Sequence, residues 1–420
     1  MLYSTTDVYA IKREIVNFAK GLLDPKNKVK SKFLTQLIYG ILRSKSVVLK
    51  DIATALDEPI QVKNTIDRLS QHLKQPLAKE VQQNYSNKVV KSLGNHPVIL
   101  VDDSDVIKPH GKAFEALGRV RDGSSKSNNI ENGYHITEIV GLTDCHKQPV
   151  SLFSQIHSSH EKRYKSANNV LFEGLEQVIQ TVNRTCTFVF DRGYDMNALF
   201  DFMYQHKQNF IVRIRENRKL FWKGKWFKAA TLRDSRKGKI KTTLTFQESG
   251  KLLKKTVYIS HLNIQITSSK KPITLVLVYG LGEKPMMLVT NRQMKGKEDV
   301  VQLVRHYMSR WRIEEYFRFK KQHFDFENFR VRSLTSIQNL NQILTYAIGL
   351  IGLLSNKRQR SVLTQRLIKN AKALRKDIQF YYYQIAMGVV ATLAYARTGI
   401  QRWFSIRRNI PRQLSLKLAI

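Results

Sequence analysis

The sequence predicts an α/β protein whose strand-containing core lies between helical segments at the two ends of the chain. Three observations support this fold class. Residues 1–92 carry apolar residues at helical intervals and few glycines, short apolar runs typical of strands begin near residue 96, and a helical pattern returns after residue 330. The length of 420 residues is consistent with two to four domains.

The first predicted domain, residues 1–92, is wholly helical. Residues 49–56 and 61–73 are predicted to form two helices separated by the turn Asp-Glu-Pro-Ile. This pattern is typical of a helix-turn-helix, whose second helix presents side chains to DNA. Those side chains are Gln61, Lys63, Asn64 and Arg68. Two packed helices of a structural bundle would give the same pattern.

The first part of the predicted core spans residues 93–216. Residues 98–102, 134–142 and 150–156 are predicted as three consecutive strands, 167–182 as a helix, and 188–191 and 209–215 as two further strands. This order is that of a ribonuclease-H-like fold. In that fold the first and fourth strands are neighbours, so the residues that end them would converge.

Two of these predicted strands lead directly into acidic residues. The segment HPVILVDDSD, residues 96–105, places Asp102 and Asp103 after an apolar run, and CTFVFDRGYD, residues 186–195, does the same with Asp191. Buried strands in α/β folds often carry catalytic groups at their carboxyl ends. Aspartate is also common in strand-to-loop turns, so each acid taken singly fits a structural role equally well.

Residues 217–285 are predicted to form a β-rich insertion in this core. Runs such as KTTLTFQ, KTVYIS, LNIQIT and ITLVLVY alternate apolar and polar residues, as half-buried antiparallel strands do. Basic residues, Trp222 and Trp226 are interleaved with these runs. Ordinary packing is the favoured role of both tryptophans, and contact with DNA is the alternative.

The second part of the core, residues 286–330, contains the most informative motif of the chain. Tyr307, Arg310, Glu314 and Lys321 have the spacing Tyr-x2-Arg-x3-Glu-x6-Lys inside a stretch predicted to be helical from about residue 299 to 323. At about 100° per residue, the four side chains fall within roughly 60° of one helical face. A carboxylate flanked by two cations and a phenol suits a metal ligand beside groups that bind phosphates.

The charge balance predicts a polyanionic partner. The chain has 71 Lys and Arg residues against 33 Asp and Glu residues, a net charge of +38. Neutralisation of phosphates with counterion release drives sequence-independent DNA binding, although ribosome-associated and membrane-surface proteins can be equally basic.

Other composition features exclude several classes of site. Cys145 and Cys186 are the only cysteines and form no CxxC motif, which argues against a zinc site or disulfide framework and favours a reducing compartment. The N-terminus has no signal-peptide core. The apolar stretch at residues 343–354 is too short to span a bilayer, so no membrane partner is expected.

The last predicted domain, residues 331–420, is helical. Such a domain would either pair two subunits or cap the catalytic core, and the sequence does not decide between these roles.

The polar loop at residues 118–129 has two interpretations as well. Arg119, Arg121 and Lys126 would contact DNA, or the loop is a solvated hairpin turn.

From residue 98 to about residue 330 the chain resembles the bacterial insertion-sequence DDE transposases that carry the YREK signature, the insertion-sequence-four group. Three motifs in the family's order carry this resemblance: VDDSD, FDRGYD and YMSRWRIEEYFRFKK. It implies that Asp102, Asp191 and Glu314 form a metal-binding catalytic triad. Asp103 competes with Asp102, since some members align better with an acid directly before Ser or Thr. Glu315 is a weaker competitor for Glu314.

The resemblance implies a cut-and-paste DNA transposase. Such an enzyme binds the terminal inverted repeats of its element, cleaves phosphodiester bonds with Mg²⁺, or Mn²⁺ as a substitute, and joins the 3′-hydroxyl end to target DNA. Tyr307, Arg310 and Lys321 would then orient phosphates, and the helices of residues 1–92 would bind the element end. A homodimer in a synaptic complex and a bacterial, nucleoid-associated cytoplasmic location are expected.

One residue departs from the family pattern. Met286 stands where well-studied members have a tryptophan that stabilises a flipped base, so a hairpin intermediate is less firmly implied than the triad. Two alternative functions remain: a ribonuclease-H-like nuclease without strand transfer, and a non-catalytic, sequence-specific DNA binder.

Overall fold

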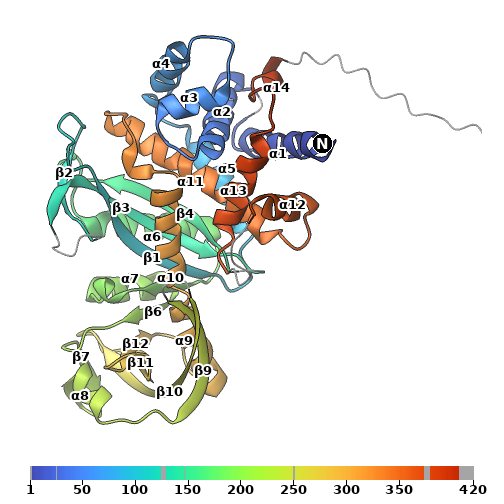
Figure 1. Cartoon of the computed structure of the whole chain (residues 1–420). Helices are drawn as coiled ribbons and strands as arrows, with labels where there is room; N and C mark the ends of the chain where they lie inside the picture. Colours follow the sequence, from blue (N-terminus) through green and yellow to red (C-terminus); the bar gives the residue numbers. More distant parts are fainter. Residues whose placement is uncertain are drawn as a thin grey trace, which may run out of the picture.

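The computed structural model describes residues 2–24, 26–123, 129–145, 147–248, 251–372 and 379–405. Lys126 therefore lies outside the described residues. Within the described part, helices of both chain ends gather at one side of the molecule and strands β7–β12 lie at the opposite side (Figure 1). The α/β class predicted from the sequence is confirmed, since one large mixed sheet is combined with many helices.

The described N-terminal residues are helical, as the spacing of their apolar residues predicts. The helices are α1 (Leu2–Lys20), α2 (Lys28–Ser44), α3 (Leu49–Leu56), α4 (Val62–Leu73) and α5 (Lys79–Val90). Helices α3 and α4 coincide with the predicted helix, turn and helix. The turn between them begins at Asp57, whose φ of 50° lies in the left-handed region that ends many helices.

The core strands include three neighbouring parallel strands, β1 (Val98–Ile107), β5 (Thr187–Phe190) and β6 (Asn209–Arg213). The others are β2 (Gly118–Arg121), β3 (Ile130–Leu142) and β4 (Pro149–His157). Strand β1 pairs parallel with β5 and antiparallel with β3, while β6 pairs parallel with β5 and β4 pairs with β3. The first and fourth strands predicted from the sequence, β1 and β5, are thus neighbours.

The remaining strands continue the same sheet. They are β7 (Lys219–Trp222), β8 (Lys225–Lys228), β9 (Ile240–Glu248), β10 (Lys251–Ile266), β11 (Lys271–Tyr279) and β12 (Met286–Thr290). Strand β12 pairs with β6 on one side and with β11 on the other, so the predicted β-rich insertion is joined edge to edge with the core. Among the described residues, twelve strands form this one sheet.

Helices inside the core segment connect these strands. They are α6 (Ala167–Val182), α7 (Asn197–Gln205) and α8 (Ala229–Asp234), together with the 3-10 turn η1 (Arg192–Tyr194) that follows β5. Helix α6 matches the predicted helix at both ends. The side chain of Ser166 accepts a hydrogen bond from the Asn169 backbone at its N-terminus, and Asn183 ends it in the left-handed conformation.

The signature stretch is not one continuous helix, and the prediction of a helix from about residue 299 to 323 was wrong in this respect. Helix α9 (Lys297–Met308) is followed by a tight turn, helix α10 (Trp311–Arg318) and a π-helical turn η2 (Phe319–His323). At the turn, the Ser309 hydroxyl donates to the His306 carbonyl at 2.6 Å, a local bond that competes with the helical ladder.

The C-terminal helices pack back onto the N-terminal helices and the core. They are α11 (Leu334–Asn356), α12 (Val362–Asn370), α13 (Tyr382–Leu393) and α14 (Arg402–Ser405), preceded by the 3-10 turn η3 (Phe326–Asn328). Helix α11 is long and apolar enough to cross a membrane by length and composition, but 83% of its apolar window is buried against the rest of the protein. It is the buried helix that the sequence predicts.

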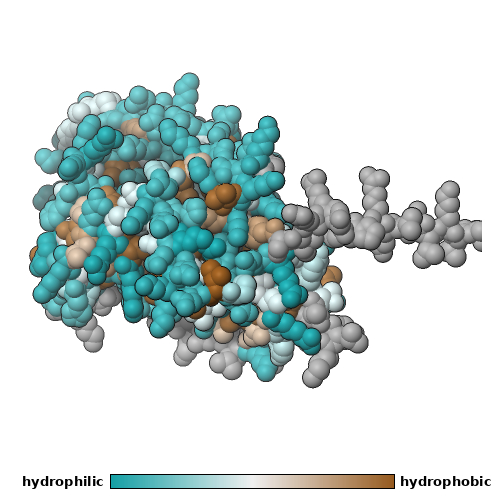
Figure 2. All heavy atoms as spheres, turned by 90° about the horizontal axis from the view of Figure 1, so that it is seen from above, coloured by the Kyte–Doolittle hydropathy of each residue, from teal (hydrophilic) through white to brown (hydrophobic). Residues whose placement is uncertain are grey.

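The surface agrees with the basic composition. Viewed from above, hydrophilic side chains cover most of the visible face, and hydrophobic residues appear there in small groups (Figure 2). The apolar residues instead form one core cluster that runs from the N-terminal helices through the sheet. Hydrophobic burial therefore joins the helical ends to the strands.

Candidate active site

Two of the predicted catalytic acids lie side by side on adjacent parallel strands, Asp102 in the middle of β1 and Asp191 directly after the end of β5. Val101 of β1 is in register with Phe190 of β5, so Asp102 and Asp191 directly follow this pair. In both strands a buried apolar run, residues 98–101 and 187–190, directly precedes the acid. Strand β1 continues beyond the predicted end at residue 102, since it stays paired with β3 as far as Ile107. Both acids line one cavity of about 260 Å³.

The turn between α9 and α10 brings further residues of the signature to these acids. Arg310 Nη1 lies 3.1 Å from Asp102 Oδ2, and Arg310 Nη2 forms an ion pair with Glu314 Oε1. The Tyr307 hydroxyl donates to Asp191 Oδ1 at 3.3 Å. The structure therefore gathers Asp102, Asp191, Tyr307, Arg310 and Glu314 into one site.

Burial shapes the electrostatics of this site. Loss of water around the Asp102 carboxyl raises its pKa to about 7, although Arg310 acts in the opposite direction. Burial, followed by the nearby Asp191 carboxylate, raises the pKa of Tyr307 to about 12. Burial alone would lower the pKa of Arg310, but Asp102, Asp191 and Glu314 outweigh it and raise that pKa. The guanidinium is therefore a fixed positive charge among carboxylates.

Asp103, the competitor for the first acid, has different partners. Its Oδ1 accepts a hydrogen bond from Thr137 at 2.6 Å, and its Oδ2 accepts one from Tyr194 at 2.7 Å. It lines the same cavity as Asp102 and Asp191. Asp102 is the carboxylate that pairs with the signature arginine, and Asp103 is the one held by neutral hydroxyl groups.

Glu315, the competitor for Glu314, lies in a separate environment. Its side chain is 14% exposed and forms only a loose ion pair with Arg312, with 3.8 Å between Arg312 Nη1 and Glu315 Oε2. Burial raises its pKa to about 7. Glu314 is 50% exposed at the side chain and pairs with Arg310, so the two neighbours point to different parts of the structure.

The carboxylates of the site suit a hard divalent cation, but their oxygen atoms do not converge on one point that a cation could occupy. Carboxylate oxygens are the ligands that Mg²⁺ and Mn²⁺ prefer. Among the described residues, no three His, Cys, Asp or Glu side chains are grouped closely enough to hold a metal ion. The Arg310 guanidinium bridges Asp102 and Glu314, and it would have to release both before the three acids could share a cation.

Lys321, the last residue of the signature, lies apart from this group. Its Nζ forms an ion pair with Glu327 at 3.2 Å, and Glu327 also accepts a hydrogen bond from the Ile107 backbone. Ile107 lies five residues beyond Asp102 on β1, a distance along the strand of about 16 Å. The turn at residue 309 and the π-helical turn change the helical phase, so Lys321 does not share the face predicted for it.

The predicted DNA contacts of the N-terminal helices divide into two kinds. Lys63 is exposed on α4, as are Gln61 and Asn64 at the start of the helix. Arg68 instead forms an ion pair at 2.6 Å with Glu58, whose side chain is 2% exposed. Arg68 therefore neutralises a buried carboxylate within the domain.

The arginines of the polar loop lie on β2. Arg119 is exposed and donates to the Asn132 side chain and the Ile130 carbonyl, each at 3.1 Å. Arg121 is also exposed. Strands β2 and β3 form the hairpin that the sequence allowed as the alternative to a DNA-contacting loop.

Sequence reasoning missed a buried ion pair behind the site. Lys320 and Glu138 have side chains 1% and 0% exposed and pair with each other. Ser151 and Ser154 donate to the Glu138 carboxylate at 2.9 and 2.7 Å. The signal was present, because Glu138 interrupts the apolar run of a strand predicted to be buried.

Met286 and the two tryptophans of the insertion have three different environments: a cavity, the core and the surface. Met286 lines a second cavity of about 310 Å³ together with Tyr307, Arg310 and Trp311. Trp222 is packed against the core, in agreement with a structural role. Trp226 differs, since 46% of the residue is exposed.

Comparisons with known proteins identify the family of the chain. Residues 95–350 match the family model described as Transposase DDE domain. Among solved structures, the chain is similar to a piggyBac transposase synaptic complex with hairpin DNA, at 10% identity and a TM-score of 0.46, over 92% of this chain and 78% of that one. No curated protein matches. Because the family model covers more than half of the 420 residues, the chain belongs to the transposases with a DDE domain.

Proposed function

We propose that this protein is a cut-and-paste DNA transposase of the YREK insertion-sequence group. It would bind the terminal inverted repeats of its element, cleave there and join the freed 3′-hydroxyl to target DNA. The observation that carries the proposal is the placement of Asp102, on β1, and Asp191, directly after the neighbouring β5, beside the Arg310–Glu314 pair. The strand order β4-β3-β1-β5-β6 supports a ribonuclease-H-like core.

Asp102, Asp191 and Glu314 are proposed as ligands of Mg²⁺, with Mn²⁺ as a substitute. When bound, such ions activate an oxygen nucleophile and stabilise the leaving oxygen of a phosphodiester. Arg310 is proposed to exchange its carboxylate partners for a DNA phosphate, since a guanidinium binds either group with the same fork of donors. That exchange would free Asp102 and Glu314 to act as ligands, while Tyr307 stays beside Asp191.

The helices of residues 1–92 are proposed to bind the element end through Lys63, Gln61 and Asn64 on the exposed start of α4. Lys321 and Arg121 are proposed as further phosphate contacts. All four of the cations of Arg68, Arg119, Arg121 and Lys321 have intramolecular interactions, which they would exchange for contacts with DNA. Excision requires both element ends to be held together, so a homodimer in a synaptic complex is proposed.

Cleavage of a labelled duplex that carries the flanking element end tests the proposal. With Mg²⁺, the native protein is expected to nick at the 3′ end of the element, and Glu314→Ala is expected to lose the nicking while it retains DNA binding. Glu315→Ala is the matched control, because the two glutamates are adjacent and have different partners. Equal cutting by the native protein and Glu314→Ala would overturn the assignment of Glu314.

Two further comparisons complete the test. Asp102→Asn is expected to abolish cleavage, whereas Asp103→Asn is expected to keep measurable activity, because Asp103 is held by Thr137 and Tyr194 and not by the signature. The reverse result would make Asp103 the first acid. Supplying pre-cut ends with a free 3′-hydroxyl and a target plasmid separates transposition from hydrolysis, since only a transposase yields joined products.

A further inference from the structure

The position of the Asp191 carboxylate depends more on the backbone than on bonds to the side chain itself. Among the described residues, the Tyr307 hydroxyl is the one group that hydrogen-bonds to this carboxylate, and at 3.3 Å the bond is long. Asp102, by comparison, pairs with Arg310 at 3.1 Å and also accepts a hydrogen bond from the Asp103 backbone. The contacts that fix the chain on both sides of Asp191 therefore fix its carboxylate.

On one side of Asp191 the chain is fixed by the sheet. Phe190, the residue before the acid, is fully buried and is in register with Val101 of β1 and Val212 of β6. Phe190 is also the last residue of β5. The strand ladder therefore ends directly before the acid and does not hold the residues that follow it.

On the other side, the first buried residues are Tyr194 and Asp195. The Tyr194 hydroxyl donates to Asp103 Oδ2 at 2.7 Å, and the Asp195 side chain is 1% exposed. The two residues between Asp191 and Tyr194 are exposed. Asp191 thus begins a short bridge between the end of β5 and a buried anchor.

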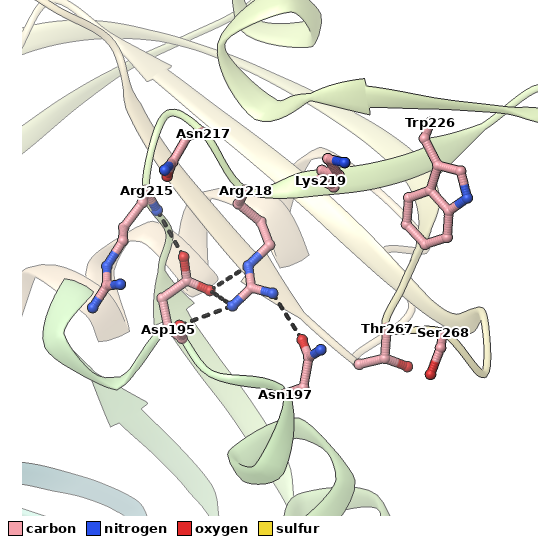
Figure 3. Close-up of a pocket in the computed structure, with 9 residues that line it drawn as sticks. All are labelled: Asp195, Asn197, Arg215, Asn217, Arg218, Lys219, Trp226, Thr267 and Ser268. Atoms are coloured by element: carbon pink, nitrogen blue, oxygen red, sulfur yellow. Dashed lines mark hydrogen bonds and ion pairs between the residues drawn. The ribbon is translucent and has the colours of Figure 1, made fainter.

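The partner of Asp195 is Arg218, at the entry of the β-rich insertion. Arg218 Nη2 and Nε lie 2.6 and 2.8 Å from Asp195 Oδ1, and Nη2 also donates to the Asp195 carbonyl at 2.8 Å. Arg218 Nη1 donates to Asn197 Oδ1 at 2.7 Å, and the Arg215 backbone donates to Asp195 Oδ2 at 2.9 Å. Figure 3 shows these bonds as dashed lines at one wall of a cavity of about 580 Å³.

All three guanidinium nitrogens of Arg218 thus bind one segment, residues 195–197. A lysine has a single nitrogen and could not form this set of bonds. Arg218 is fixed from the insertion as well, because its carbonyl accepts a hydrogen bond from the Ala229 backbone at 2.7 Å and its chain continues directly into β7. The Asp195–Arg218 pair therefore connects the chain after Asp191 to the start of the insertion.

We propose that Asp195 and Arg218 are positioning residues for the second acid of the site. They hold the residues after Asp191 against the entry of the insertion, so that the Asp191 carboxylate stays beside Asp102. Neither side chain lines the cavity of the acids. Asp195 acts through the backbone that joins it to Asp191, and Arg218 acts through Asp195. The inference rests on the proposed function, because it takes Asp191 as a metal ligand.

The substitution Asp195→Asn in the full chain tests the inference. The side chain keeps its size, but its amide accepts hydrogen bonds on one side only, so either Arg218 or the Arg215 backbone loses its acceptor. Titration calorimetry of the DNA-free protein is expected to show Mn²⁺ affinity lowered roughly tenfold or more, as is typical when groups that orient metal ligands are removed. Cleavage of the bound element end should need a correspondingly higher Mg²⁺ concentration. Affinity for the element end should not fall, because the substitution removes no positive charge.

Matched variants assign the effect to this pair. Arg218→Gln is expected to lower Mn²⁺ affinity as Asp195→Asn does, and the double variant should be no weaker than either single variant, because both break the same connection. Arg218→Lys keeps the charge without the fork of donors and should restore only part of the affinity. Asp7→Asn is the control, since Asp7 on α1 is a largely buried carboxylate that pairs with Arg366 at 2.8 Å. It should change the melting temperature but not Mn²⁺ affinity.

The outcomes separate this inference from the function on which it rests. Native Mn²⁺ affinity in a folded Asp195→Asn protein would overturn the inference, and the transposase proposal would stand if Asp191→Ala still abolished cleavage. An equal loss of Mn²⁺ affinity in Asp7→Asn would also overturn it, because the effect would then follow stability alone. If Asp195→Asn does not fold, Arg218→Lys decides in the same way. Unchanged Mn²⁺ binding and cleavage in Asp191→Ala would end both proposals.

Discussion

At the scale of single residues, Arg310 holds together carboxylates that would otherwise repel one another. It pairs with Asp102 at 3.1 Å and with Glu314, and its side chain is only 17% exposed. A divalent cation would compete for the same carboxylate oxygens. The guanidinium thus stabilises the site in this structure, and under the proposed function it would have to release the carboxylates when metal and DNA bind.

Replacing Arg310 by Gln is therefore expected to raise the affinity of the DNA-free protein for Mn²⁺, by roughly tenfold, which corresponds to about 1.4 kcal/mol. Titration calorimetry measures this change. Cleavage of element ends should fall in the same variant because a phosphate contact is lost. Arg305→Gln on the exposed surface of α9 is the control and should leave both quantities unchanged. Weaker Mn²⁺ binding by Arg310→Gln would contradict the proposed competition.

His157 predicts a pH dependence of folding. The residue is 2% exposed, burial lowers its pKa to about 4, and its Nε2 lies 3.1 Å from Thr137 Oγ1. Its ring neighbours are His135, which pairs with Asp105, and Tyr164. Because the pKa in the unfolded state is about 6.5, the unfolded chain binds more protons between pH 6.5 and 4.

The stabilisation from neutral His157 is thus complete above pH 6.5 and is lost as the pH falls towards 4, up to roughly 3 kcal/mol. Urea unfolding at pH 7, 5.5 and 4.5 measures it. His157→Phe should flatten this dependence in part, since burial also lowers the pKa values of His306 and His323 to about 4. The exposed His110→Phe is the control. An unchanged slope in His157→Phe would refute the assignment.

At the scale of elements, α4 contains two basic residues with different expected roles: Arg68 stabilises the fold and Lys63 binds DNA. Glu58 is buried and accepts hydrogen bonds from Gln36 and Thr65, each at 2.8 Å, in addition to its ion pair with Arg68. Arg68→Ala should lower the free energy of unfolding by about 1–3 kcal/mol, because a buried carboxylate loses its counterion. Lys63→Ala should leave stability within about 0.5 kcal/mol and weaken binding of the element end. Thermal unfolding measures the stability of both variants, and DNA titration measures their affinity for the element end. If Arg68→Ala and Lys63→Ala were equally stable and weakened DNA binding equally, the two residues would not have different roles.

The π-helical turn after α10 contains a similar pair of adjacent lysines. Lys320 is buried against Glu138, Ser154 and Thr345, whereas Lys321 is 24% exposed and pairs with Glu327. Lys320→Met should destabilise the protein by about 3–5 kcal/mol, because Glu138 would remain buried without a counterion. Lys321→Met should cost less than about 1 kcal/mol. Denaturant unfolding compares the two, and similar losses would show that Glu138 does not depend on Lys320.

The sequence predicted elements well where local signals decide them. Helices α3 and α6 have the predicted bounds, and α4 begins within one residue of its prediction, since apolar spacing and turn residues mark their ends. The break at Ser309 and the π-helical turn were not predicted. Lys320 enters the core there because Glu138, on a strand far away in sequence, provides its partner. Sequence spacing alone could not show that this long-range pair rotates Lys321 away from the acids.

At the scale of the whole molecule, the sheet passes without interruption from the core strands to the insertion. Strand β12 connects β6 to β11, so the strands around the acids and those around Trp226 share one hydrogen-bonded frame. The sequence indicated both groups of strands but gave no sign of how they join. The pairing of two strands at a sheet edge has no sequence motif, because it depends on backbone N–H and C=O groups, which nearly every residue possesses.

The net charge of +38 belongs to the chain as a whole, and it predicts how DNA affinity responds to salt. If the basic surface contacts at least six phosphates, the logarithm of the association constant should fall against the logarithm of salt concentration with a slope of about −5 or steeper. Affinity should then drop roughly a thousandfold between 50 and 200 mM salt. Fluorescence anisotropy with the Glu314→Ala variant measures binding without cleavage. Lys63→Ala should reduce the magnitude of the slope by about 1. Arg68→Ala should not change the slope, because the native Arg68 side chain is paired with Glu58. A slope near −1 for the Glu314→Ala protein would contradict this prediction, because it would mean that most of the excess positive charge does not contact DNA phosphates.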